Sequence, residues 1–103
     1  MRKRGFKSLY QAILALQTEN EARAFLRDLL TAAEFKEFEN RWEAAQMLSQ
    51  KIPYLAIEKS TGLSSTTVAR VSKWLNQGKG GYRSIIGRLN NTAHNHKQPA
   101  RSA

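Results

Sequence analysis

The sequence contains no cysteine, and this absence excludes disulfides, thiolate metal sites and cysteine nucleophiles. Proline is nearly absent as well, with only Pro53 and Pro99. No apolar run approaches the roughly 20 residues of a membrane span. The basic start MRKRGFK is not followed by an apolar segment, so it does not resemble a secretory signal. These absences predict a soluble, cytoplasmic protein.

Acidic residues are scarce in the second half of the chain. The formal net charge is +9, and the sequence pI of about 10.4 is typical of nucleic-acid-binding domains. Seven of the eight acidic residues lie between residues 19 and 43. From residue 44 onward the sequence has one acidic residue, Glu58, and nine basic residues. A polyanion would therefore be attracted to the two ends of the chain rather than to its middle. A basic surface that serves solubility alone is the alternative.

The chain of 103 residues is long enough for one domain, and its pattern is helical throughout. Nothing alternates with period two, and apolar residues recur at spacings of three and four. Pairs of a hydroxyl residue and Glu or Gln three positions later are typical of helix starts. Three such capping boxes occur, at Ser8-x-x-Gln11, Thr18-x-x-Glu21 and Thr31-x-x-Glu34. We expect an all-α fold of five to six helices.

The first three predicted helices carry more apolar surface than one short chain can cover. The first two are short and apolar, and the third has a stripe that we expect to pack in a core, comprising Phe35, Phe38, Trp42, Ala45 and Leu48. Short amphipathic helices are marginal in isolation, and a small domain has a thin core. The apolar load therefore predicts a homodimer.

Residues 53–76 have the spacing of a helix-turn-helix motif. Pro53 can begin a helix, Gly62 can adopt the positive φ of a tight turn, and Ser64 is suited to cap the next helix. Four aliphatic residues occupy the inward positions of such a motif, namely Ile57, Leu63, Val68 and Val71. Leu75 is expected to be buried with them.

Four consecutive hydroxyl residues stand at the start of the second helix of this motif. Capping uses one or two hydroxyls but not four, whereas a recognition helix enters the major groove with its N-terminal end foremost. Small residues that donate and accept hydrogen bonds suit that position. We expect Lys79 to contact a DNA phosphate, and the predicted DNA-binding residues are Ser64, Ser65, Thr66, Thr67, Ala69, Arg70, Lys73 and Lys79.

The segment RWEAAQMLSQKIPYLAIEKSTGLSSTTVARVSKWLNQGKGGY resembles the tryptophan-repressor superfamily, in particular its small stand-alone YerC/YecD-type branch. The resemblance covers about residues 8–90 and is carried by Arg41-Trp42-Glu43, Leu48, residues 57–62, SSTTVARV and residues 77–81. It implies an intertwined homodimer of the N-terminal helices and a repressor that binds a palindromic operator in double-stranded DNA.

Two departures from the family pattern concern ligand binding and packing. Arg70 matches the arginine that holds the ligand in tryptophan-binding members, but Val71 follows it where those members have glycine. We expect Val71 to fill part of the space that an indole needs, so that the protein does not respond to tryptophan and either binds DNA constitutively or has a different effector. The sequence identifies no cofactor or effector. Thr61 replaces the leucine before the turn glycine, which is expected to loosen the packing there.

The predicted organisation is a basic arm (1–7), one helical domain (8–90) and a disordered tail (91–103). Within the domain, residues 8–50 form the dimerisation helices, 53–76 the helix-turn-helix, and 82–90 a last helix. That helix is expected to pack back on the domain through Tyr82, Ile85, Ile86 and Leu89. His94 and His96 in the tail are not expected to form a metal site.

Other functions are less well supported by the sequence. Catalysis is not expected, because both histidines are in the tail and no glycine-rich loop follows a strand. RNA binding is disfavoured, because the outward face of the recognition helix is expected to lack aromatic residues for stacking. The main alternative is a protein-interaction adaptor that uses the helical dimer without specific DNA binding.

Overall fold

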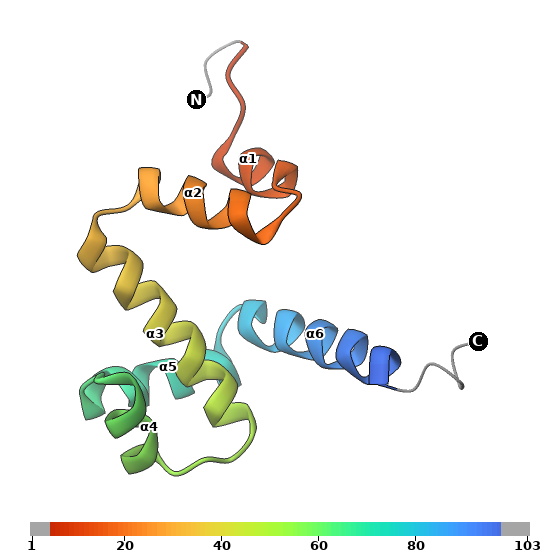
Figure 1. The fold of residues 1–103 in the computed structure, drawn as a ribbon. Coiled ribbons are helices and arrows are strands. Elements are labelled where there is room, and N and C mark those ends of the chain that lie inside the picture. The colour runs from red at the N-terminus through yellow and green to blue at the C-terminus, as the bar shows by residue number, and fades with distance from the viewer. Residues whose placement is uncertain (1–4, 98–103) are drawn as a thin grey trace. The chain divides into compact units, whose positions relative to one another are not determined.

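The computed structural model describes residues 5–97, and the side chains of residues 5–91. Six helices and no strand occur in this part of the chain, which confirms the all-α prediction (Figure 1). The helices are α1 (Leu9–Ala15), α2 (Glu19–Leu29), α3 (Ala32–Ser49), α4 (Tyr54–Thr61), α5 (Ser65–Gln77) and α6 (Gly81–Lys97). None of these helices is long and apolar enough to span a membrane. The chain divides into two compact units, residues 1–37 and 38–103.

The helix starts in the first unit follow the predicted capping pattern with one variation. Ser8 and Gln11 form a complete capping box at α1. At α3, Thr31 Oγ1 accepts the Glu34 N–H at 3.1 Å, and the Glu34 carboxylate accepts the Thr31 N–H at 2.8 Å. At α2, Thr18 caps in the same way, but the Glu21 carboxylate accepts the N–H of Gln17 instead of that of Thr18. Local sequence therefore sets where these helices begin.

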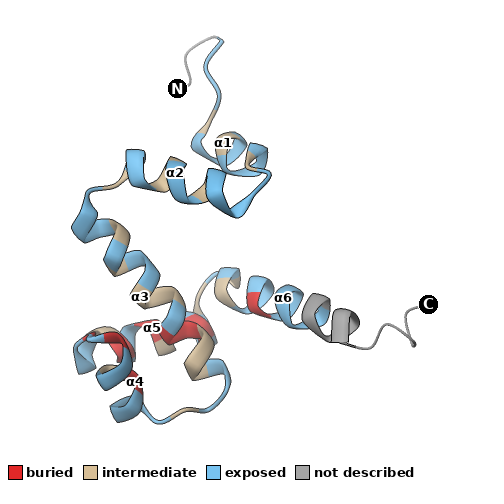
Figure 2. Ribbon diagram, viewed as in Figure 1, coloured by how far each residue is buried: buried red, intermediate tan, exposed pale blue. Residues whose placement is uncertain are grey.

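The first unit has no buried core of its own. Neither α1 nor α2 contains a buried residue, and Figure 2 shows this part of the chain without red segments. Leu14 is 83% exposed and Tyr10 is 73% exposed. The predicted stripe of α3 is covered only in part: Phe38 is 50% exposed, whereas Ala45 is buried and Trp42 and Leu48 pack against the core of the second unit. No apolar side chain of α1 or α2 is therefore fully buried, and several are largely exposed.

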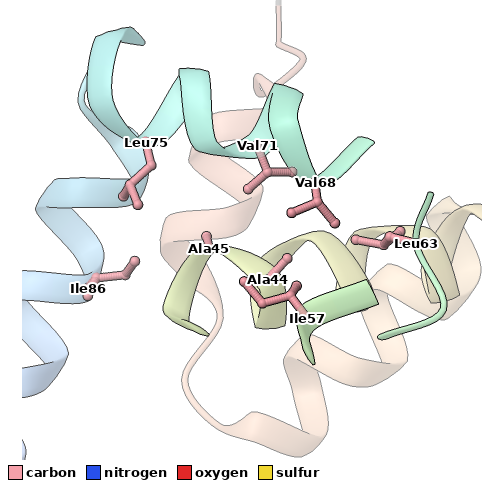
Figure 3. Packing of buried hydrophobic residues seen from close by; sticks show 8 residues of the cluster. All are labelled: Ala44, Ala45, Ile57, Leu63, Val68, Val71, Leu75 and Ile86. Carbon is pink, nitrogen blue, oxygen red and sulfur yellow. The ribbon is translucent and has the colours of Figure 1, made fainter. Parts of the chain in front are cut away.

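The second unit has a compact core between α3 and the helix-turn-helix. Figure 3 shows Val68 and Val71 of α5 directed toward Ala44 and Ala45 of α3 and toward Ile57 of α4. Every inward position predicted for the helix-turn-helix is buried, as is Leu75, which faces Ile86 of α6. Protein interiors are close-packed, so a large side chain on one helix needs a small one opposite it. The alanines of α3 leave that room for the branched valines of α5. This core fixes which side of α5 faces outward.

Lys51 closes the C-terminal end of α3 in a left-handed conformation, with φ of 66°. Its N–H donates to Leu48 O at 3.0 Å, and the N–H of Ile52 donates to Met47 O at 3.1 Å, which is the Schellman arrangement. Glycine is usual at this position because a side chain there costs about 1 kcal/mol. Lys51 is the one non-glycine residue with positive φ among residues 5–97.

The last helix differs from its prediction in length and packing. α6 continues to Lys97, whereas the sequence predicted a last helix over 82–90 and a disordered tail from residue 91. No glycine after Gly87 and no proline before Pro99 interrupts it. Residues 98–103, and the side chains of His94 and His96, lie outside the described residues. Ile86 is buried and Tyr82 packs on the core as expected, but Ile85 and Leu89 are exposed.

Candidate nucleic-acid interface

The turn between α4 and α5 is closed by Gly62 and Thr61. Gly62 has φ of 79°, and its N–H donates to Glu58 O at 2.8 Å. The Thr61 hydroxyl donates to Ile57 O at 2.8 Å and accepts the Leu63 N–H at 3.2 Å, while its side chain is buried. The Thr61 hydroxyl thus joins the end of α4 to the turn, a role that a leucine at this position could not take.

Two of the four hydroxyl residues at the start of α5 are used to cap the helix. Ser64 Oγ accepts the Thr67 N–H at 3.1 Å and donates to Thr67 Oγ1 at 3.1 Å. Ser65 and Thr66 are exposed, and in the described part of the chain their hydroxyls make no hydrogen bond. Capping thus accounts for Ser64 and Thr67 and leaves Ser65 and Thr66 available to another molecule.

The outward face of α5 is polar, basic and free of acids. The term outward face refers here to five exposed residues of α5 that the sequence predicted to contact DNA, namely Ser65, Thr66, Ala69, Arg70 and Lys73. They lie opposite the buried Val68 and Val71, which hold the helix against the core. α5 contains no acidic residue, and no ion pair or hydrogen bond within residues 5–97 engages the Arg70 guanidinium. Lys79 is also exposed, but it lies beyond the end of α5.

Two neighbouring residues of α3 contact aromatic rings of α5 and α6, and the sequence did not predict these partners. The guanidinium of Arg41 lies 5.9 Å from the ring centre of Trp74 on α5. The ring of Trp42 stacks on Tyr82 of α6 at 6.4 Å. Burial raises the pKa of Tyr82, and the positive charge of Arg41 opposes this shift. The R-W pair itself was visible in the sequence, but its contacts depend on the tertiary fold.

An apolar groove of about 780 Å³ lies beside these contacts, lined by Trp42, Trp74, Gly78, Lys79, Gly81, Tyr82 and Ile85. Trp74 is 41% exposed there. An aromatic side chain is therefore accessible beside the face that was expected to lack aromatic residues, and Arg41 covers one face of its indole. Trp74 flanks the outward face and does not belong to it.

Comparison with known proteins agrees with the resemblance found in the sequence. The family model of the Trp repressor protein matches residues 4–90. The uncharacterized protein YerC of Bacillus subtilis (strain 168) is 34% identical over 92 residues, which span 89% of this chain and 88% of YerC. The crystal structure of a TrpR-like protein from Eubacterium eligens ATCC 27750 superposes with a TM-score of 0.76 at 40% identity, covering 80% of this chain and 84% of that one.

A solved structure from Staphylococcus aureus gives a TM-score of 0.75 at 35% identity and covers 80% of this chain and 82% of its own. The region matched by the family model, residues 4–90, includes all of α4 and α5 and therefore the whole helix-turn-helix. The family model describes regulatory DNA-binding proteins rather than enzymes. The chain belongs to the Trp repressor protein family.

Proposed function

We propose that this protein is a cytoplasmic transcriptional repressor that binds a palindromic operator as a homodimer, with α5 in the major groove. The observation that carries this proposal is the outward face of α5. Ser65 and Thr66 lie near the N-terminal end of the helix, where recognition helices meet base edges, and no described residue engages their hydroxyls. Ala69 is small enough to allow close approach, and Arg70 and Lys73 add positive charge.

The bare apolar helices of the first unit support the homodimer. A second chain would cover the exposed side chains of α1 and α2, and the exposed Ile85 and Leu89 of α6 offer further apolar surface. In this arrangement residues 8–90 act as one domain only when paired. The two copies of α5 would then lie about 34 Å apart, one turn of B-DNA. The basic arm, residues 1–7, would contact phosphates.

Lys79 tests the DNA-binding proposal by its effect on salt dependence. Counterion release makes the affinity for DNA fall with salt in proportion to the number of phosphates neutralised. Lys79→Ala is expected to weaken binding to all sequences alike and to lower the slope of log K against log salt by roughly one. The measurement is a salt titration of DNA binding by fluorescence anisotropy.

Lys36→Ala is the matched control, because Lys36 is also exposed but lies in the acid-rich segment of the chain. It should leave the slope unchanged. An unchanged slope for Lys79→Ala as well would remove Lys79 from the interface. An affinity for DNA that hardly depends on salt in the unmodified protein would favour the adaptor function instead.

The position of Val71 predicts that free tryptophan does not bind beside Arg70. Val71 is fully buried against the core, so an indole forced against it would overpack the site. Overpacking costs about 1–3 kcal/mol, which corresponds to about one or two decades of affinity at 1.4 kcal/mol per decade. Calorimetry with L-tryptophan should show no saturable binding tighter than about 100 μM (−5.5 kcal/mol). Tighter binding with a matching gain in DNA affinity would contradict this prediction.

A further inference from the structure

The second unit contains another pocket, which is separate from the outward face of α5. Its volume is about 520 Å³, within the range of small-molecule sites. None of the five outward-face residues lines this pocket. It lies where the end of α3, the start of α4, α5 and α6 come together. Its polar lining includes Ser49, Lys51, Tyr54, Ser72, Asn76 and Arg83.

The charge of this pocket is positive, and no acid lines it. Lys51 and Arg83 are the cationic residues of the lining. Arg83 Nη2 donates to Asn76 O at 3.2 Å, which leaves the other guanidinium donors available while it fixes the group against α5. Tyr54 and Ser72 add hydroxyl groups to the lining residues, and the Ser72 hydroxyl accepts from Asn76 Nδ2 at 3.5 Å. Such a concentration of donors and positive charge is suited to an anion with several oxygens.

The backbone of Lys51 is a second, independent observation. A lysine stands in the left-handed position that ends α3, where glycine would be free of strain. Unfavourable backbone conformations of this kind gather at functional sites, because the surrounding structure holds a side chain where it is needed. At this position the strained residue lines the pocket with its cationic side chain.

We infer that this pocket binds a small molecule that carries a phosphate group. A phosphate monoester has a charge of about −1.5 to −2 at pH 7, which matches two cations better than a single carboxylate does. Its several oxygens can accept from Lys51, Arg83 and the two hydroxyls together. The pocket also reaches the buried Leu75, which a small molecule could contact with its apolar part. A DNA phosphate is the competing source of the same chemistry, and the duplex titration below distinguishes the two. A ligand in this pocket touches α3, α4, α5 and α6 at once.

The test is an NMR titration of the full chain with ribose 5-phosphate, with ribose as the neutral control. Ribose 5-phosphate is expected to shift the amide signals of Lys51, Tyr54, Ser72 and Arg83 saturably, with a Kd tighter than about 1 mM. Ribose should shift none of them. Arg83→Gln and Lys51→Gly should each weaken binding by about tenfold or more, since each removes a charge-assisted contact. Lys59→Ala removes an exposed lysine outside the pocket and should leave binding unchanged.

Lys51→Gly also separates binding from folding. Glycine relieves the left-handed strain, so the Tm of this variant should stay the same or rise by about 4 °C even though binding is lost. If the Lys51→Gly variant bound ribose 5-phosphate as tightly as the unmodified chain, the inference would be overturned. The absence of saturable shifts in the unmodified chain would also overturn it.

A second titration with a random-sequence DNA duplex distinguishes the source of the phosphate. Shifts of the Lys51 and Arg83 signals with DNA but not with ribose 5-phosphate would overturn the inference, because the pocket would then be a backbone contact. Thr66→Glu, which is designed to disrupt DNA recognition, should still bind ribose 5-phosphate. Failure of the DNA-binding proposal and failure of this inference therefore give different results.

Discussion

Replacing Thr66 by glutamate is expected to lower the affinity for selected operator DNA by at least about a hundredfold, which is about 2.8 kcal/mol at 1.4 kcal/mol per tenfold. Like charges brought together at an interface cost several kcal/mol, and a carboxylate at this position would face the phosphates of the groove. The fold should be unaffected, because the Thr66 side chain is exposed and takes no part in the Ser64 cap. An acid in the first turn of a helix is even favourable. The measurement is fluorescence anisotropy with a selected duplex, together with a thermal melt.

Two variants control for charge and for shape at this position. Asn90→Glu adds the same charge at an exposed position of α6 outside the outward face and should change the affinity by less than about threefold (0.65 kcal/mol). Thr66→Ser keeps the hydroxyl and should retain most of the binding. Operator affinity that survives Thr66→Glu would show that α5 does not enter the groove as proposed.

Replacing Leu14 by aspartate is expected to weaken the homodimer by at least about a hundredfold, because a buried, unpaired carboxylate is costly. Leu14 is 83% exposed in one chain, so the same change should have little effect on a monomeric protein. Light scattering should give about 23 kDa for the unmodified protein, twice the chain mass of 11.7 kDa. The variant should shift toward the mass of a single chain at micromolar concentration.

Asn20→Asp serves as the control for charge in the same unit. Asn20 is polar and exposed in the first turn of α2, where an acid interacts favourably with the helix dipole. This variant should remain dimeric. An unmodified protein that scatters as a single chain at these concentrations would contradict the dimer directly, and with it the role assigned to α1 and α2.

The helix-turn-helix could be predicted because short-range patterns determine it. Gly62 supplies the turn, Ser64 supplies the cap, and the spacing of Ile57, Val68 and Val71 determines the buried side. Once that side is known, the outward face follows from helical geometry. These features depend on residues close in sequence, and the structure agrees with each of them.

Features that depend on tertiary packing could not be predicted in the same way. The partners of Arg41 and Trp42 lie on α5 and α6, far along the chain, and spacing alone does not identify them. The spacing of Ile85 and Leu89 on α6 predicts that both are buried, yet both side chains are exposed in the structure. The left-handed Lys51 was also missed, because lysine gives no sequence signal for positive φ.

Selection of bound DNA from a random pool tests most directly whether two copies of α5 bind one operator. The enriched sequences should contain an inverted repeat whose half-sites are centred about 10 base pairs apart, since the two-fold axis of the dimer is mirrored in its site. Thr66→Glu should enrich no such repeat from the same pool. Enrichment of a single, unrepeated half-site, or of no sequence at all, would contradict a homodimer that reads the major groove through α5.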